Sequence, residues 1–199
     1  HVVTPYEINP VYKGSADGQY PFPKEGIIVD PFVAMTMAGT VTERIKVATA
    51  VLVLPNRNPV VVAKLLASID YLTGGRVMLG AGVGWMEEEI TMLGQPFTDR
   101  GAWCTEAIDL MRTLWADEKA SFDGKYFHIP EVGFQPKPVN KHIPILIGGT
   151  SGAALRRVVK QGDGWLPSNL TFELLAHGIA TLKENCEREG RDYGELTIC

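Results

Sequence analysis

One strand-to-helix turn in the chain combines the features that suit a phosphate. An apolar run, residues 145–147, ends at Gly148 and Gly149, and Thr150 and Ser151 then precede a helical pattern. The first N–H groups of a helix have no partner inside it, and the helix start carries positive charge, so this turn suits an anion. The same residues also fit a plain turn in which Thr150 or Ser151 is the N-cap. The turn therefore predicts either a site for a phosphorylated cofactor or a helix cap.

The elements around this turn alternate between strand and helix. We expect helices at residues 31–42, 60–71, 100–115, 152–161 and 171–189, and strands at 45–54, 76–82, 145–149, 163–167 and 196–199. The strand at 45–54 is apolar almost throughout, which is typical of a parallel strand buried on both faces. An Asp-Gly pair at Asp123-Gly124 predicts a hairpin, and residues 1–30 read as a long loop.

This alternation predicts a parallel sheet with right-handed crossovers. The sheet is either open and doubly wound or closed into a (β/α)8 barrel. Five strands are visible, and the sheet looks unfinished at both ends. A barrel of the usual size, about 250 residues, needs about three more strands. The chain therefore looks like a fragment of one domain, and both arrangements stay open.

The composition narrows the class of protein. The chain has 199 residues, 45% of them hydrophobic, with a net charge of −4 and no basic run, so we expect no nucleic-acid partner. Its longest apolar stretch, residues 47–54, is too short to cross a bilayer. Three cysteines without C-x-x-C spacing predict reduced thiols, no metal site and a cytoplasmic location.

Four separated motifs resemble a known family. They are Thr49-Ala50-Val51-Leu52-Val53-Leu54-Pro55-Asn56-Arg57-Asn58-Pro59, Gly80-Ala81-Gly82-Val83-Gly84-Trp85, Pro136-Lys137-Pro138 with Ile147-Gly148-Gly149, and Asp163-Gly164-Trp165-Leu166-Pro167. In this order and spacing, over nearly the whole chain, they resemble the bacterial luciferase-like superfamily of (β/α)8 oxidoreductases. The resemblance is closest to the branch of probable coenzyme F-420 enzymes. It implies that residues 1–199 form a single, incomplete (β/α)8 barrel domain, whose first two strands and last part are absent here.

The resemblance implies a catalytic histidine and a cofactor site. His1 falls where family members carry a histidine facing the reactive ring of the cofactor, and an imidazole can accept or donate a proton near neutral pH. Family members that use the deazaflavin often have a non-proline cis peptide after barrel strand three, and the matching pair here is Ala50-Val51. The other implied cofactor-binding residues are Gly82, Gly84, Gly148, Gly149, Thr150, Ser151 and Trp165, although Trp165 also fits a core position.

Charged residues near these motifs allow predictions about burial, ion pairing and a basic rim of the site. Glu87 reads as part of a solvated helix start, whereas Glu88 or Glu89 could turn inward and Arg100 could pair with one of them. A basic rim for an acidic cofactor tail would favour the deazaflavin, and its candidates are Arg57, Lys137, Lys141 and Arg156. Sugar-phosphate dehydrogenases of the family carry a catalytic glutamate where this sequence has Trp85. A hydroxyl-oxidising role that needs this acid is therefore in doubt.

The sequence is compatible with three functions. The first is an oxidoreductase that transfers a hydride between coenzyme F-420 and a small organic substrate, and the second is an FMN-dependent monooxygenase on the same barrel. The third is a catalytically silent flavin-binding paralogue. The resemblance also implies a homodimer. Four aromatic residues of the N-terminal loop favour an apolar or aromatic substrate, namely Tyr6, Tyr12, Tyr20 and Phe22. His128, His142 and His177 are expected to be surface or packing residues.

Overall fold

The computed structural model describes residues 1–8, 12, 15, 18–20 and 23–199. Within the described part of residues 1–30 there is no helix or strand, as the loop prediction requires. The predicted site residue Phe22 lies outside the described residues. The first element is therefore the helix α1, Pro31–Thr40.

The parallel sheet is wound in chain order. Its strands are β1 (Val47–Ala48), β3 (Val77–Gly82), β6 (Ile145–Gly148), β7 (Gly164–Leu166) and β8 (Thr197–Ile198), each beside the next, and β2 (Leu52–Val53) also pairs with β3. A doubly wound sheet would reverse its order at a switch point, whereas a (β/α)8 barrel keeps chain order. The described strands therefore form an arc of a barrel, which decides between the two predicted closures.

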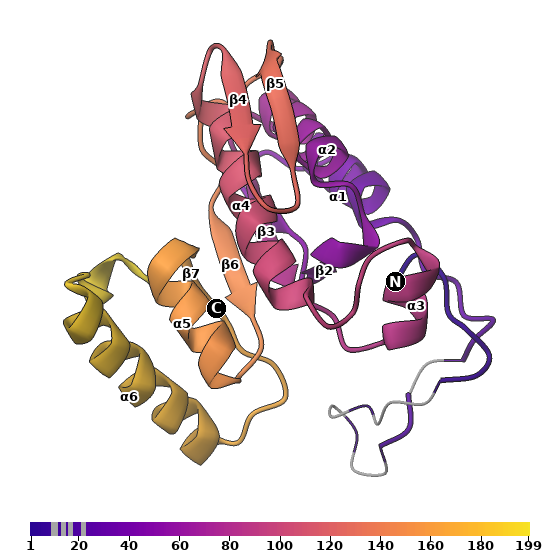
Figure 1. Ribbon diagram of the computed structural model, residues 1–199, viewed down its shortest axis with the longest axis vertical. Helices are drawn as coiled ribbons and strands as arrows, with labels where there is room; N and C mark the ends of the chain where they lie inside the picture. The colour runs from indigo at the N-terminus through magenta and orange to yellow at the C-terminus, as the bar shows by residue number, and fades with distance from the viewer. Residues whose placement is uncertain (9–11, 13–14, 16–17, 21–22) are drawn as a thin grey trace.

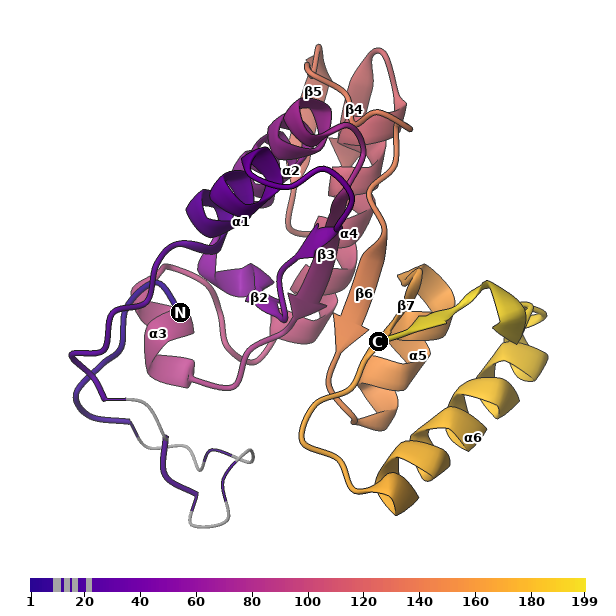
Figure 2. The same cartoon turned by 180° about the vertical axis from the view of Figure 1, so that it is seen from behind.

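The helices form a second layer on one face of this arc. They are α1, α2 (Pro59–Thr73), α4 (Arg100–Ala116), α5 (Gly152–Gln161) and α6 (Phe172–Glu189), and most neighbours along the chain are in contact. Figure 1 views the molecule from the side on which α4 and α5 lie in front, and Figure 2 shows β3 and β6 in front of α4. The remaining elements are α3 (Glu87–Met92), the 3-10 turns Leu54–Asn56 and Tyr193–Glu195, and the hairpin β4 (Ala120–Asp123) with β5 (His128–Val132).

Local signals place the helix ends where the sequence predicts them. The Asp30 side chain accepts from Phe32 N–H, and the Asn58 side chain accepts from Val60 N–H, so each caps a helix that begins with proline. At the other end, Gly74 closes α2 and Gly190 closes α6 in the left-handed conformation, with φ of 68° and 69°.

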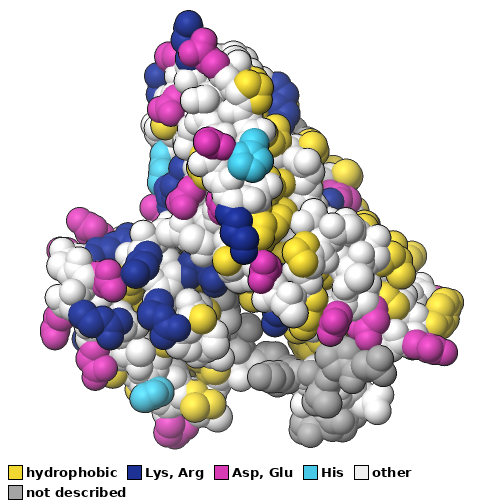
Figure 3. Space-filling model, viewed as in Figure 1, with side chains coloured by type: hydrophobic (Ala, Val, Ile, Leu, Met, Phe, Trp, Pro, Cys, Tyr) yellow, Lys and Arg dark blue, Asp and Glu magenta, His cyan; other side chains and the backbone are white. Residues whose placement is uncertain are grey.

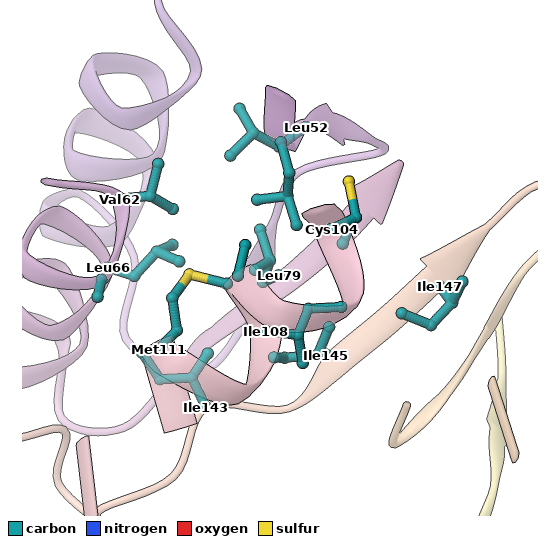
Figure 4. Close-up of a cluster of buried hydrophobic side chains, with 14 of the residues drawn as sticks. Leu52, Val62, Leu66, Leu79, Cys104, Ile108, Met111, Ile143, Ile145 and Ile147 are labelled. Carbon is teal, nitrogen blue, oxygen red and sulfur yellow. The ribbon is translucent and has the colours of Figure 1, made fainter. Parts of the chain in front are cut away.

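The core lies between the sheet and the helices. In β3, Leu79 and Ala81 are buried toward α2 and α4, and the intervening Gly80 faces the other side of the sheet. Figure 4 shows Leu79 among side chains of α2 and α4, including Leu66 and Ile108. Because strand residues alternate between faces, the glycine-containing positions share the side of the sheet opposite the helices.

The predicted strand at 45–54 is wrong in one respect, because it is interrupted. The pairing stops between β1 and β2, and the Thr49 hydroxyl donates to the Gly80 carbonyl at 2.8 Å. A Cβ at Gly80 would come within 2.0 Å of the Thr49 carbonyl oxygen. The backbone thus bends over Gly80, and the Ala50-Val51 peptide bond in this bend is cis.

None of the described helices is both long and apolar enough to cross a membrane. Among the described residues, no group of histidine, cysteine, aspartate or glutamate side chains is arranged to hold a metal ion. The three cysteines, Cys104, Cys186 and Cys199, are unpaired, as the sequence predicts.

Candidate functional site

Most of the predicted site residues lie at the carboxyl ends of the parallel strands. Gly82 ends β3, Gly148 ends β6, and His1 lies at the same end of the sheet, to which the arrowheads of β3 and β6 point (Figures 1 and 2). In α/β barrels this end carries the active site. The fold therefore brings together residues that are up to 147 positions apart in the chain.

Val51 is the centre of the predicted cofactor face. Cβ atoms added to Gly82 and Gly148 would each lie 2.7 Å from a Val51 methyl group, so a side chain at either position would have to displace Val51. Val51 thus lies between these two glycines of different strands. With 40% of its surface exposed, Val51 offers an apolar surface flanked by bare backbone.

The turn after β6 has the geometry of a helix cap and also that of an anion site, the two interpretations made from the sequence. The Ser151 side chain accepts from Ala154 N–H at 3.2 Å and is the N-cap of α5, which confirms the cap. Gly149 has a φ of 95°, a conformation that favours glycine. Thr150 is exposed, and the first-turn N–H groups of Gly152 and Ala153 have no partner inside the helix. The capped helix start thus keeps free donors for an anion.

His1 is held by a buried carboxylate. Its Nδ1 lies 2.5 Å from Glu89 Oε2, and Glu89 comes from the first turn of α3 with 1% of its side chain exposed. In this first turn Glu87 is exposed, as the sequence predicts. Glu89 is buried, which agrees with the prediction that Glu88 or Glu89 turns inward. The expected pairing of Arg100 with one of these glutamates is wrong, because Arg100 donates to the Gly84 and Phe97 carbonyls instead.

Aromatic rings surround this histidine. The His1 ring centre lies 5.3 Å from that of Tyr20 and 6.3 Å from that of Trp85, both in edge geometry. Tyr12 completes the cluster, with ring centres 5.1 Å from Trp85 and 5.9 Å from Tyr20. Burial, and then the charge of Glu89, raise the pKa of Tyr20. The cluster packs against His1, 17% of whose side chain is exposed, and joins the N-terminal loop to the turn after β3.

A cavity of about 280 Å³ opens beside these residues. His1, Val51 and Arg57 contribute to its wall, together with Asn56. The Asn56 side chain is buried, and neither its amide nitrogen nor its oxygen has a hydrogen-bond partner among the described residues. Asn56 was not predicted from the sequence. The one signal for it is its position between Pro55 and Arg57, in the first of the four motifs that resemble the family.

Trp165 does not line this face, so the core position is the correct one of its two expected placements. It points to the helix side of β7, is fully buried and packs on Gly178 of α6. Its indole N–H donates to the Gly149 carbonyl at 2.8 Å. Trp165 therefore supports the turn from behind, because odd and even residues of a short strand face opposite ways.

The expected basic rim is largely wrong. Lys137 donates to the Leu114 and Asp117 carbonyls, and Lys141 pairs with Glu118 at 2.8 Å, so both lie at the far end of α4. Arg57 is at the rim but pairs with Asp30 at 2.8 Å. Arg156 is close to the turn, because its Nη1 lies 3.3 Å from the position of a Cβ on Gly152. Figure 3 shows dark blue side chains gathered over α5 and α6.

Comparison with known proteins shows the family to which the chain belongs. The family described as luciferase-like monooxygenase matches residues 15–199, and the chain belongs to this family. An uncharacterized protein of Mycobacterium tuberculosis is 32% identical over 193 residues, which are 96% of this chain and 68% of the relative. The F420-dependent glucose-6-phosphate dehydrogenase of Nocardia farcinica is 36% identical over 169 residues, or 81% of this chain and 50% of that protein.

A solved structure shares the fold. The F420-dependent secondary alcohol dehydrogenase, in complex with an F420-acetone adduct, superposes with a TM-score of 0.75 at 23% identity. The match covers 85% of this chain and 53% of that protein. The chain thus spans about half the length of this neighbour, and the likeness confirms a luciferase-like barrel fold.

Proposed function

We propose that the full-length protein is a coenzyme F-420-dependent oxidoreductase that acts on a small organic substrate. The observation that carries this proposal is the meeting of His1, Val51 and the Gly148–Ser151 turn at one end of the barrel arc. Relatives named as F420-dependent support the choice of cofactor. A homodimer belongs to the same proposal and rests on the family resemblance, and a cytoplasmic location rests on the three cysteines without C-x-x-C spacing.

The residues present fit such a cofactor. Val51 and the bare backbone of Gly82 and Gly148 form a surface on which a flat ring can lie. The first N–H groups of α5, the exposed Thr150 hydroxyl and the neighbouring Arg156 suit a phosphate group. When bound, coenzyme F-420 supplies hydride chemistry, and the protein supplies orientation and electrostatics.

The chain's own groups would then act on protons and water. Because Nδ1 of His1 faces Glu89, its Nε2 is the atom left to hold or accept a proton next to the cavity. The cluster of Tyr12, Tyr20 and Trp85 would exclude water from that atom and favours an apolar or aromatic substrate. Trp85 stands where family sugar-phosphate dehydrogenases have a catalytic glutamate, so we propose a substrate other than a sugar phosphate.

Equilibrium titration of the full-length protein with coenzyme F-420 and with FMN tests this proposal. We expect the deazaflavin to bind at least about tenfold more tightly, a difference of about 1.4 kcal/mol. A preference for FMN would favour the monooxygenase function, and binding of neither would favour a silent paralogue. Either result would overturn the proposal.

A matched pair of variants tests the phosphate turn. Thr150→Val removes an exposed hydroxyl at the turn, and Thr40→Val removes an exposed hydroxyl at the end of α1. We expect only the first to weaken coenzyme F-420, by several-fold, because one neutral hydrogen bond contributes about 0.5–1.5 kcal/mol. Equal affinities for the two variants would remove the turn from the proposed site.

A further inference from the structure

We propose that Glu89 is a positioning residue that selects the tautomer of His1 and leaves Nε2 free to work at the cavity. The inference rests on the proposed function, because it gives His1 its proton-handling role. It concerns a residue 88 positions away from His1 in the chain.

Both carboxylate oxygens of Glu89 are occupied by the same segment. Oε2 lies 2.5 Å from His1 Nδ1, whereas Oε1 accepts from the backbone N–H of Val2 at 2.6 Å and of Val3 at 3.2 Å. The carboxylate therefore holds both the imidazole and the backbone that carries it. This arrangement restrains the position of the ring as well as its rotation.

Burial makes this contact specific. Glu89 has 1% of its side chain exposed, and a buried carboxylate needs hydrogen-bond donors. An ionised carboxylate has only acceptors, so His1 must present Nδ1–H to it. In the neutral ring the proton then stays on Nδ1, and Nε2 is the basic atom.

The variant Glu89→Gln should reverse this tautomer. The amide has the same size, and its oxygen would remain with the two N–H donors of Val2 and Val3. Its NH2 group would then face His1 Nδ1, which would have to accept, so the proton would move to Nε2. A ring with the wrong tautomer presents a donor where an acceptor is needed.

Glu87→Gln is the matched control. Glu87 occupies the same first turn of α3, so its replacement removes the same charge near the helix start, but its side chain is exposed. In the full-length protein we expect Glu89→Gln to lower kcat at least about tenfold with little change in KM. We expect Glu87→Gln to leave both values near those of the wild type.

The decisive readout is the ¹⁵N NMR spectrum of the histidine rings, with the His1 signals assigned by their loss in His1→Asn. We expect Nδ1–H for the wild type and Glu87→Gln, and Nε2–H for Glu89→Gln. The wild-type spectrum alone tests the inference if Glu89→Gln does not fold. An Nε2–H tautomer in the wild type, or an unchanged tautomer in a folded Glu89→Gln, would overturn it.

This readout needs no bound cofactor. If coenzyme F-420 does not bind but the tautomer switches, the proposed function fails and the positioning by Glu89 stands. If the cofactor binds and turns over while the tautomer stays unchanged, the inference on Glu89 fails and the proposed function stands.

Discussion

The Val51 side chain lies directly over Gly148, so that a Cβ on this glycine would approach a Val51 methyl group to 2.7 Å. Val51 comes from the bend between β1 and β2, and Gly148 ends β6, two positions across the sheet. The contact links the bend to the turn that begins at Gly149. Any side chain at Gly148 must therefore move Val51.

The variant Gly148→Ala should weaken coenzyme F-420 binding. Its methyl group would push Val51 out of the proposed ring surface, and we expect the affinity to fall about tenfold, or about 1.4 kcal/mol. Gly133→Ala is the control, because no atom lies within 4 Å of a Cβ at that position. Fluorescence titration compares the two, and unchanged affinity in Gly148→Ala would separate Val51 from the cofactor site.

Gly178→Ala should destabilise the fold. A Cβ at Gly178 of α6 would lie 2.3 Å from the indole ring of Trp165, which is rigid and fully buried. Overpacking of this kind costs about 1–3 kcal/mol. Urea denaturation measures the loss, and Ala180→Ser, an exposed change in the same helix, should stay within about 0.5 kcal/mol of the wild type. Equal stabilities would contradict the described packing of α6.

Asp163→Asn and Asp123→Asn should differ in their effect on stability. Asp163 accepts from Arg112 at 2.8 Å and from Ile145 N–H at 2.7 Å, and 29% of its side chain is exposed. Asp123 contacts His128 at 2.6 Å but is 92% exposed. Because exposed ion pairs contribute little, we expect a loss of about 1–2 kcal/mol for Asp163→Asn and under about 0.5 kcal/mol for Asp123→Asn. Thermal unfolding checks this order, and the reverse order would refute it.

Stability should fall in alkaline solution partly because of Cys104. Burial raises the pKa of this thiol from 9.0 to about 12. The unfolded chain releases the proton near its ordinary pKa while the folded chain keeps it, so the free energy of unfolding decreases as pH rises from 9.0 toward about 12. At full effect the slope is about 1.4 kcal/mol per pH unit.

The variant Cys104→Ala isolates this contribution. It lacks the thiol, so the stability difference between wild type and variant should shrink as the pH rises above about 9. Urea denaturation at neutral pH and at about pH 10 measures this difference. A difference that is independent of pH would show that the Cys104 thiol ionises equally in both states.

The sequence predicted the helices and their ends well. The caps at Asp30, Asn58 and Ser151 follow from side chains that bond to the backbone two or three residues away. The closing conformations of Gly74 and Gly190 follow from the absence of a Cβ. These interactions span a few residues, so their residue types are sufficient to predict them.

The residues of the candidate site were predicted less completely than the helices. The resemblance pointed to His1, to the cis bond at Ala50-Val51 and to the turn after β6, but it also placed Trp165 at the cofactor and Lys137 and Lys141 at the rim. The structure turns Trp165 to the helix layer and sets both lysines against the far end of α4. The direction of a side chain depends on which face of the sheet its strand presents, and a motif does not carry that information.

By itself, then, the sequence determined the alternation of strands and helices, the capped helix starts and the turn at Gly148–Ser151, because each depends on neighbours in the chain. Only the tertiary structure decided that the strands follow chain order, that Val51 covers two glycines of other strands, and that Glu89 holds His1. The contacts of Val51 and Glu89 join residues that are 31 to 97 positions apart in the chain. Such residues meet only when the strands pair in one register and the other segments pack around them.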